Sequence, residues 1–265
     1  MTHVIVDGRS VSVPADANLL QTVRAGGVEL PTLCYFDGLA PFGACRLCMV
    51  TVTAPRHALV AACSYPVEDG LVVETHAPDA VAIRRLALEF LLCRCPTSDV
   101  IRSLAARAGI TELRFRPTGQ ADELCVLCGL CVRVCRDLVG AAAIGFTGRG
   151  KNRAVGTPFR VQAEACIGCG ACAAVCPTGA VKIEDADGKR VLRTWNTVVP
   201  LKPCPVCGQP FAPEPMAFLR ELAEASESLW SMCPACRRKS AAAHLDLVRQ
   251  ASPHQRDGAR RGMGV

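Results

Sequence analysis

The sequence lacks the patterns that mark the common nucleotide-binding enzymes. No G-x-G-x-x-G follows a predicted strand and no G-x-x-x-x-G-K-[ST] occurs, so neither a Rossmann dinucleotide site nor a P-loop is predicted. The five histidines are scattered and show no pattern suited to acid–base work (His3, His57, His76, His244 and His254). We therefore expect no substrate chemistry on this chain itself.

Long apolar runs are missing, and aromatic side chains are scarce at 5% of the chain. A membrane helix needs roughly eighteen apolar residues, and the best candidate, residues 80–93, is interrupted by Arg84 and Arg85. The first residues alternate between polar and apolar, which is not the pattern of a secretory signal peptide. These absences predict a cytoplasmic protein without a transmembrane segment.

Cysteine is the residue that the sequence has in excess, with 18 in 265 positions. Such a count requires disulfides, metal ions or metal clusters, and in a reducing compartment it indicates metal ligands. The cysteines form four sets of four and one pair. The formal net charge of +6 treats every thiol as neutral. Because thiolate-bound metals add negative charge, this balance is weak evidence for a nucleic-acid partner.

Residues 1–78 are predicted to form a small β-grasp ferredoxin domain. Apolar residues alternate on both sides of Asp7-Gly8, which indicates a hairpin. Asn18 is a candidate N-cap for a helix that Gly26-Gly27 ends, and strands are expected over 49–53 and 71–75. The spacing C-x10-C-x2-C-x14-C can hold a [2Fe–2S] cluster, with the ligands Cys34, Cys45, Cys48 and Cys63.

Residues 122–199 contain an internal repeat in which C-x2-C-x2-C-x3-C returns after 41 residues. Two such runs are typical of bacterial two-[4Fe–4S] ferredoxins, where the fourth cysteine of each run binds the other cluster. The first cluster is predicted to use Cys125, Cys128, Cys131 and Cys176. The second is predicted to use Cys135, Cys166, Cys169 and Cys172. We expect the fourth cysteine of each run to begin a short helix.

Residues 200–249 contain two C-P-x-C knuckles separated by 25 residues, slightly more than in a usual zinc ribbon. Four thiolates suit a closed tetrahedral zinc site, with the ligands Cys204, Cys207, Cys233 and Cys236. A third [4Fe–4S] cluster and unligated thiols are the alternatives. A helix is expected over 215–230 between the knuckles. Residues 250–265 lack periodicity and predict a flexible tail.

The cysteine motifs resemble a known family. Cys34-Tyr35, the run Pro41-x-Gly43-x-Cys45-Arg46-x-Cys48 and Ala62-Cys63 resemble the N-terminal ferredoxin domain of the complex I large iron–sulfur subunit. The diaphorase iron–sulfur subunit of bidirectional nickel–iron hydrogenases, NAD-dependent formate dehydrogenases and iron-only hydrogenases share this resemblance. Residues 125–135 and 176–180 are similar to the diaphorase subunit. Two complete four-cysteine runs point away from complex I proper, which usually holds one cluster here.

Residues 79–121 are predicted to be a helical connector, with Ser98-Asp99 capping its second helix. In the family, this region often holds a further [4Fe–4S] cluster with one histidine and three cysteine ligands. Here only Cys93 and Cys95 are available, so we predict that this cluster is absent. The pair is either two structural thiols or a half-site that a partner completes.

The predicted fold class is thus α+β, with two ferredoxin domains, a helical connector and a zinc-ribbon-like unit. The resemblance implies a non-catalytic subunit that relays electrons in a multisubunit oxidoreductase. Its implied partners are a flavin-bearing, NAD(P)H-oxidising subunit and a catalytic hydrogenase or formate-dehydrogenase subunit. An independent ferredoxin-like carrier and a cluster-bearing nucleic-acid-binding protein are the alternative functions.

Overall fold

The computed structural model describes residues 1–118, 120–213 and 232–251. Its contacts divide the chain into two compact units. The first comprises residues 1–166, 170–183 and 192–196; the second comprises 167–169, 184–191 and the chain from 197 onward. Within the described ranges, no helix combines the length and apolarity that a bilayer crossing demands.

The first unit begins with a mixed five-stranded sheet of order β2-β1-β5-β3-β4. Its strands are β1 (Thr2–Val6), β2 (Arg9–Val13), β3 (Met49–Ala54), β4 (Ala58–Ala61) and β5 (Leu71–Glu74). The predicted hairpin is confirmed, because β1 and β2 pair antiparallel around Asp7-Gly8. Both turn residues have positive φ, as a type I′ turn in a two-residue hairpin loop requires. β1 also pairs parallel with β5.

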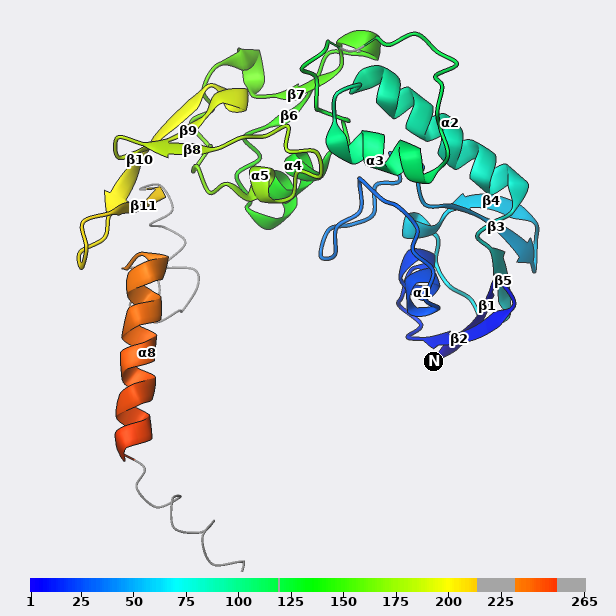
Figure 1. Ribbon diagram of the computed structural model, residues 1–265, viewed down its shortest axis with the longest axis horizontal. Helices are drawn as coiled ribbons and strands as arrows, with labels where there is room; N and C mark the ends of the chain where they lie inside the picture. Colours follow the sequence, from blue (N-terminus) through cyan, green and yellow to red (C-terminus); the bar gives the residue numbers. More distant parts are fainter. Residues whose placement is uncertain (119, 214–231, 252–265) are drawn as a thin grey trace, which may run out of the picture. The chain divides into compact units, whose positions relative to one another are not determined.

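The predicted helix after Asn18 is confirmed as α1 (Leu19–Ala25), which lies against the sheet in Figure 1. The Asn18 side chain accepts from the Gln21 amide at 3.0 Å, and the Gln21 side chain accepts from the Asn18 amide at 3.0 Å. This reciprocal capping box satisfies amides that the first helical turn leaves open. The apolar face of α1 is fully buried in the core of this sheet, so the cysteine-bearing loop that follows starts from a fixed point.

Two helices, α2 (Pro78–Arg94) and α3 (Asp99–Arg107), form the predicted connector and lie side by side in Figure 1. Arg84 on α2 donates to the Thr75 carbonyl at 2.7 Å, and Arg85 donates to the Ala108 carbonyl at the end of α3. Ser98 is the N-cap residue of α3, at the predicted position, but its side chain makes no capping hydrogen bond. Instead, the Ser98 backbone amide bonds to the Cys95 carbonyl at 3.2 Å.

Short elements surround the repeated cysteine runs. They are α4 (Leu130–Arg133), the π-helical η2 (Val134–Leu138), β6 (Gly145–Thr147), β7 (Ala154–Gly156) and α5 (Ala171–Ala174). The 3-10 turns are η1 (Ala62–Ser64), η3 (Gly150–Asn152), η4 (Pro158–Arg160) and η5 (Arg193–Trp195).

We had expected the fourth cysteine of each run to begin a short helix, and this prediction was wrong. Each helix starts earlier, directly after a glycine of positive φ, and contains the third cysteine.

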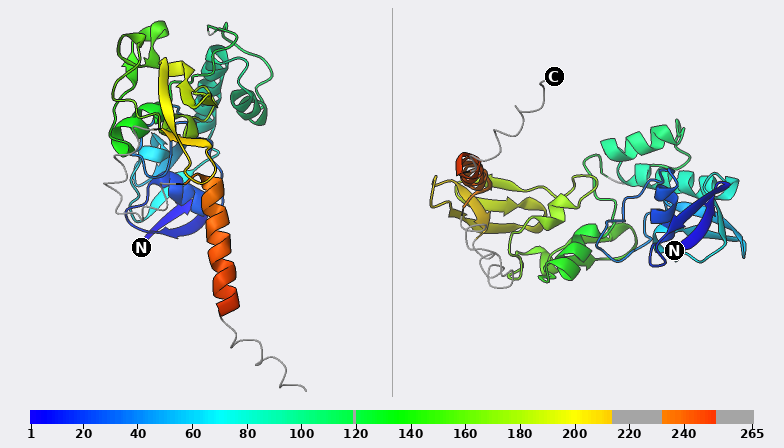
Figure 2. Two further views of the ribbon diagram at one scale, coloured as in Figure 1. Left: turned by 90° about the vertical axis from the view of Figure 1, so that its left-hand side faces the viewer. Right: turned by 90° about the horizontal axis from the view of Figure 1, so that it is seen from below.

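The second unit contains a four-stranded sheet of order β11-β10-β9-β8. Its strands are β8 (Glu184–Ala186), β9 (Lys189–Leu192), β10 (Thr197–Pro203) and β11 (Pro210–Pro213). The helix α8 (Pro234–Ala251) is a single uninterrupted element in Figure 2. The helix expected over 215–230 lies outside the described residues. Residues 252–265 of the expected tail also lie outside the described residues, whereas residues 250 and 251 are the last two residues of α8.

Candidate iron–sulfur and metal sites

The loop between α1 and β3 brings together cysteines predicted to bind a [2Fe–2S] cluster. The Sγ atoms of Cys34 and Cys45 are 3.4 Å apart. The backbone amides of Leu33 and Cys45 lie 3.5 Å from the Cys45 and Cys34 sulfurs, respectively. Cys48 directly precedes β3, and Cys63 lies in η1. None of the 18 cysteines forms a disulfide, so all these sulfurs are available as ligands.

The four thiols differ in the direction in which their surroundings shift the pKa. Hydrogen bonds from the neighbouring thiols Cys45 and Cys63 lower the pKa of Cys34 and Cys48, respectively. The corresponding hydrogen bonds to Cys34 raise the pKa of Cys45 and of Cys63, and burial adds to both shifts. Four neighbouring thiolates, three of them buried, repel one another unless a cationic centre lies among them. Iron ions would supply that positive charge.

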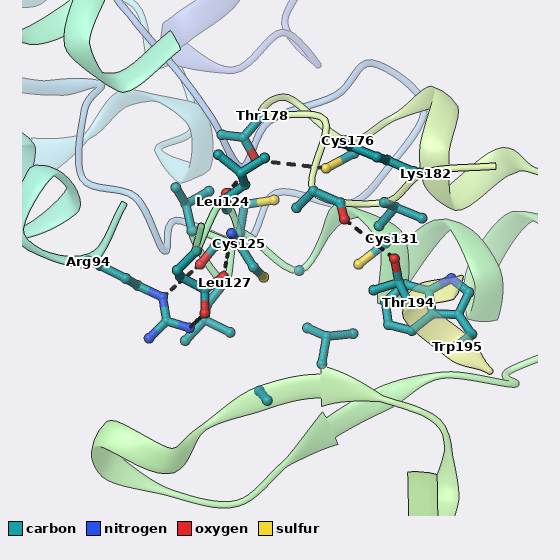
Figure 3. Close-up of a pocket in the computed structure, with 18 of the residues that line it drawn as sticks. Arg94, Leu124, Cys125, Leu127, Cys131, Cys176, Thr178, Lys182, Thr194 and Trp195 are labelled. Atoms are coloured by element: carbon teal, nitrogen blue, oxygen red, sulfur yellow. Dashed lines mark hydrogen bonds and ion pairs between the residues drawn. The ribbon is translucent and has the colours of Figure 1, made fainter. Parts of the chain in front are cut away.

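A cavity of about 420 Å³ is lined by all four cysteines predicted for the first [4Fe–4S] cluster (Figure 3). Cys125, Cys128 and Cys131 surround a turn in which Leu127 and Gly129 have positive φ. Cys176 reaches the same cavity from the second run. Burial raises the pKa of Cys128 to about 11 and that of Cys131 to about 12. These thiols would need a metal to hold them deprotonated at neutral pH.

Side chains outside the cysteine motifs fix this cavity's backbone. The Cys125 carbonyl accepts from Arg94 Nε at 2.7 Å, and the Cys125 amide donates to Glu123 Oε1 at 2.7 Å. Arg94 and Glu123 also pair with each other, at 3.4 Å. Thr178, close to Cys176, donates to the Leu124 carbonyl at 2.7 Å. The two cysteine runs are thereby tied together at this cavity, as Figure 3 shows.

The cysteines predicted for the second [4Fe–4S] cluster are divided between the two units. Cys135, Cys166 and Cys172 belong to the first unit and Cys169 to the second. Trp195, which is buried, donates from its indole Nε1 to the Cys172 sulfur at 3.4 Å. A hydrogen bond to a ligand sulfur is one of the factors that set the reduction potential of an iron–sulfur cluster.

The loop that carries Cys169 is anchored within the second unit. Arg190 on β9 donates to the Gly168 carbonyl at 3.0 Å. The same guanidinium forms a bidentate pair with Asp185 on β8, with N–O distances of 2.8 and 2.7 Å. Arg190 thus fixes the orientation of the residue next to Cys169 from a neighbouring hairpin.

The four C-terminal cysteines come together as a compact group. All sulfurs of Cys204, Cys207, Cys233 and Cys236 lie within 4.8 Å of one another, and no other such group of three or more candidate ligands occurs in the described ranges. Cys207 and Cys233 are 3.6 Å apart. A tetrahedron with Zn–S bonds of about 2.3 Å has edges of about 3.8 Å. The spacing of these sulfurs therefore suits one ion bound by all four.

Backbone amides also favour thiolates at this group. The Cys233 amide donates to the Cys204 sulfur at 3.3 Å and lowers the pKa of Cys204 to about 6. The Cys236 amide, 3.4 Å from the Cys233 sulfur, lowers the pKa of Cys233. Hydrogen bonding to the neighbouring thiol of Cys207 raises the pKa of Cys236 to about 12. The backbone amides thus favour the thiolate forms of Cys204 and Cys233 even before a metal ion binds.

The pair Cys93 and Cys95 is outside the predicted ligand sets, although the [2Fe–2S] candidate Cys45 packs against the cluster that contains Cys95. Cys95 is completely buried among Leu47, Leu88 and Ile101, and this burial raises its pKa to about 12. Cys93 is also buried, with its sulfur 3.5 Å from the Phe115 carbonyl. Sulfurs in such positions are poor candidates for a half-site that a partner completes, and the geometry favours structural thiols.

Comparison with known proteins identifies two segments. Residues 1–78 match a family described as a 2Fe-2S iron-sulfur cluster binding domain. Residues 124–195 match one described as a 4Fe-4S dicluster domain. The chain contains two iron–sulfur cluster-binding domains. The predicted fold of mixed helices and strands, with both kinds of cluster domain, is confirmed to this extent.

Relatives of the whole arrangement are parts of larger oxidoreductases. An NADH-quinone oxidoreductase subunit of Rhizobium meliloti is 32% identical over 78% of this chain and 27% of its own length. NADPH-Fe(3+) oxidoreductase subunit alpha of Geobacter sulfurreducens is 27% identical over the same shares. NADP-reducing hydrogenase subunit HndD of Solidesulfovibrio fructosivorans is 29% identical over 68% of this chain and 36% of its own length. The chain thus spans about a quarter to a third of the curated relatives it matches.

A solved structure has a similar fold. The crystal structure of an NAD+-reducing [NiFe]-hydrogenase in the H2-reduced state matches with a TM-score of 0.51 and 26% identity. The match covers 58% of this chain and 74% of that chain. The resemblance to iron–sulfur subunits of complex I and NAD(P)-linked hydrogenases is confirmed.

Proposed function

We propose that the chain is an iron–sulfur subunit that relays single electrons within a multisubunit oxidoreductase. The observation that carries this proposal is the packing of Cys34 with Cys128 in one buried apolar cluster, together with Leu39 and Leu130. These cysteines are candidate ligands of different clusters, so no further domain separates the two sites. The clusters, when bound, would accept and release one electron at a time.

The proposed ligands follow the sequence prediction. The [2Fe–2S] site uses Cys34, Cys45, Cys48 and Cys63 of a β-grasp domain over residues 1–78, which the mixed sheet and α1 support. The two [4Fe–4S] sites belong to a domain over 122–199 and use the crosswise sets around Cys176 and Cys135. The shared cavity of Cys125, Cys128, Cys131 and Cys176 supports that exchange of fourth ligands. Residues 79–121 are the connector.

The proposed partners are a flavin-bearing, NAD(P)H-oxidising subunit and a catalytic subunit of the hydrogenase or formate-dehydrogenase type. Their support is the names of the relatives, which are NAD(P)-linked oxidoreductase subunits. In this arrangement the chain receives electrons from NAD(P)H through the flavin and passes them on singly. Its own residues bind, space and insulate the carriers.

The test uses the assembled complex with this chain either present, absent or altered. We expect NAD(P)H-linked turnover of the terminal substrate to fall by at least tenfold without the chain and with Cys131→Ser. Cys93→Ser, which changes a cysteine outside the proposed sites, keeps most of the turnover. Dye reduction by the flavin subunit serves as the control for its integrity. Unchanged turnover without the chain would exclude the relay.

We also propose that residues 200–249 form a zinc-ribbon-like unit whose four cysteines bind one structural Zn²⁺. The short sulfur–sulfur spacing supports zinc over a [4Fe–4S] cluster, which keeps its ligand sulfurs farther apart because each binds a different iron. Cys236→Ser is expected to lose one zinc per chain while iron and acid-labile sulfide stay unchanged. Elemental analysis of the purified protein measures both. A loss of four irons instead would identify a third [4Fe–4S] cluster.

A further inference from the structure

Arg133 is a buried cation that forms no ion pair with a carboxylate of the described residues; the nearby Asp137 pairs with Arg136 instead. It ends α4, between Cys131 and Cys135, and is only 5% exposed. Its Nη2 donates to the Cys34 carbonyl at 2.6 Å, and its Nη1 donates to the Ala40 carbonyl. The guanidinium lies over the Phe42 ring, 5.3 Å from its centroid. The ion pairs of the described residues do not include Arg133.

One donor of this guanidinium has no acceptor. The Nε of Arg133 is buried and makes no hydrogen bond. In a planar guanidinium, the Nε–H and one Nη2–H point along the same edge. Arg136 and Arg190 each use that edge to hold both oxygens of a carboxylate. In Arg133 the edge meets a single carbonyl, that of Cys34.

A buried charge is costly unless an anion or many dipoles compensate for it. Two carbonyls and an aromatic ring compensate in part. The missing anion is available nearby, because Cys34 is a proposed [2Fe–2S] ligand and packs with Cys128, a proposed ligand of the first [4Fe–4S] cluster. Four thiolates give each of these sites a negative charge, which grows by one unit when the site is reduced.

We propose that Arg133 is the shared countercharge of the [2Fe–2S] site and the first [4Fe–4S] site. It is a positioning residue that ties α4 to the Cys34 loop, and its fixed positive charge makes both sites easier to reduce. The inference rests on the proposed function, because it assumes a cluster at each site.

The test compares three variants by redox titration followed by electron paramagnetic resonance, on the anaerobically isolated full chain. Arg133→Gln removes the charge and Arg133→Lys keeps it without the planar fork. Arg136→Gln removes a neighbouring charge that is exposed and paired with Asp137. At a fixed solution potential, we expect Arg133→Gln to change the reduced-to-oxidised ratio of the [2Fe–2S] site at least threefold toward oxidised. This corresponds to a decrease in the reduction potential of about 30 mV, at 59 mV per tenfold change in the ratio. Arg133→Lys is expected to change it less, and Arg136→Gln not measurably.

Each outcome is decisive. If Arg133→Gln loads its clusters and titrates like the wild type, Arg133 is not the countercharge. If Arg133→Gln fails to bind its clusters, the Arg133→Lys variant decides. The proposal stands if Arg133→Lys binds clusters. It falls if Arg133→Lys also fails, because then the packing of the planar guanidinium is needed and not its charge. Absence of a [2Fe–2S] signal in the wild type would instead refute the proposed function.

Discussion

The sulfur of Cys172 accepts a hydrogen bond from a residue that no cysteine motif predicts. Trp195 lies 23 residues further along the chain, and its indole N–H points at that sulfur. Arg94 and Arg133 act over even longer separations, 31 and 99 residues, on the carbonyls of Cys125 and Cys34. The chemistry of metal binding restricts ligands to few residue types at short spacings, so the cysteines could be predicted. These supporting contacts depend on the completed fold and leave no local pattern.

Replacing Trp195 with phenylalanine tests the role of the indole donor. Trp195→Phe keeps most of the buried ring and removes the N–H bond to Cys172. Loss of a hydrogen bond worth ~0.5–1 kcal/mol lowers the potential of the second [4Fe–4S] site by about 20–40 mV at 59 mV per tenfold. Redox titration measures this shift, and the [2Fe–2S] site serves as the internal control. An equal shift at both sites would point to a general disturbance of the fold.

At the scale of elements, the hairpin at Asp7-Gly8, α1 and the connector helices followed from turn residues, a capping residue and apolar periodicity. β4 was not predicted, because its four residues, Ala58–Ala61, are too few to show a period. The start of α4 was misplaced for another reason. Gly129 takes a left-handed conformation, and its φ of 74° lets the helix begin at the next residue, before the third cysteine.

Gly168 offers the clearest test of how an element holds a ligand. Its φ is +65°, and an added Cβ would lie 2.4 Å from Cγ2 of Val199 on β10. Gly188, in the β8–β9 turn, has a φ of +71° and open space around it. Gly188→Ala therefore costs only the backbone strain of about 1–2 kcal/mol. Gly168→Ala adds a steric clash and is expected to cost at least ~1 kcal/mol more.

Chemical unfolding of the loaded protein measures both variants, and iron analysis reports on the second cluster. We expect Gly168→Ala to reduce the iron content, because the clash displaces the residue next to Cys169, whereas Gly188→Ala retains it. Equal stability and equal iron in the two variants would show that the loop tolerates the displacement and does not position Cys169.

At the scale of the whole molecule, 16 of the 18 cysteines belong to the four proposed sites, one [2Fe–2S], two [4Fe–4S] and one zinc. The four C-terminal sulfurs lie close enough to share one ion, and no other three candidate ligands in the part of the chain that the structure describes form such a compact group. The chain itself shows no nucleotide motif. This distribution suits a subunit that carries electrons between partners, with a separate structural metal stabilising its C-terminal part.

The most direct test of the relay is electron paramagnetic resonance of the anaerobically isolated chain during stepwise reduction, with iron and sulfide measured on the same sample. We expect three separately reducible paramagnetic centres, one of the [2Fe–2S] type and two of the [4Fe–4S] type, with about two irons for the first and about four for each of the others. A sample with full metal content but no reducible paramagnetic centre would contradict the proposed electron-carrying role.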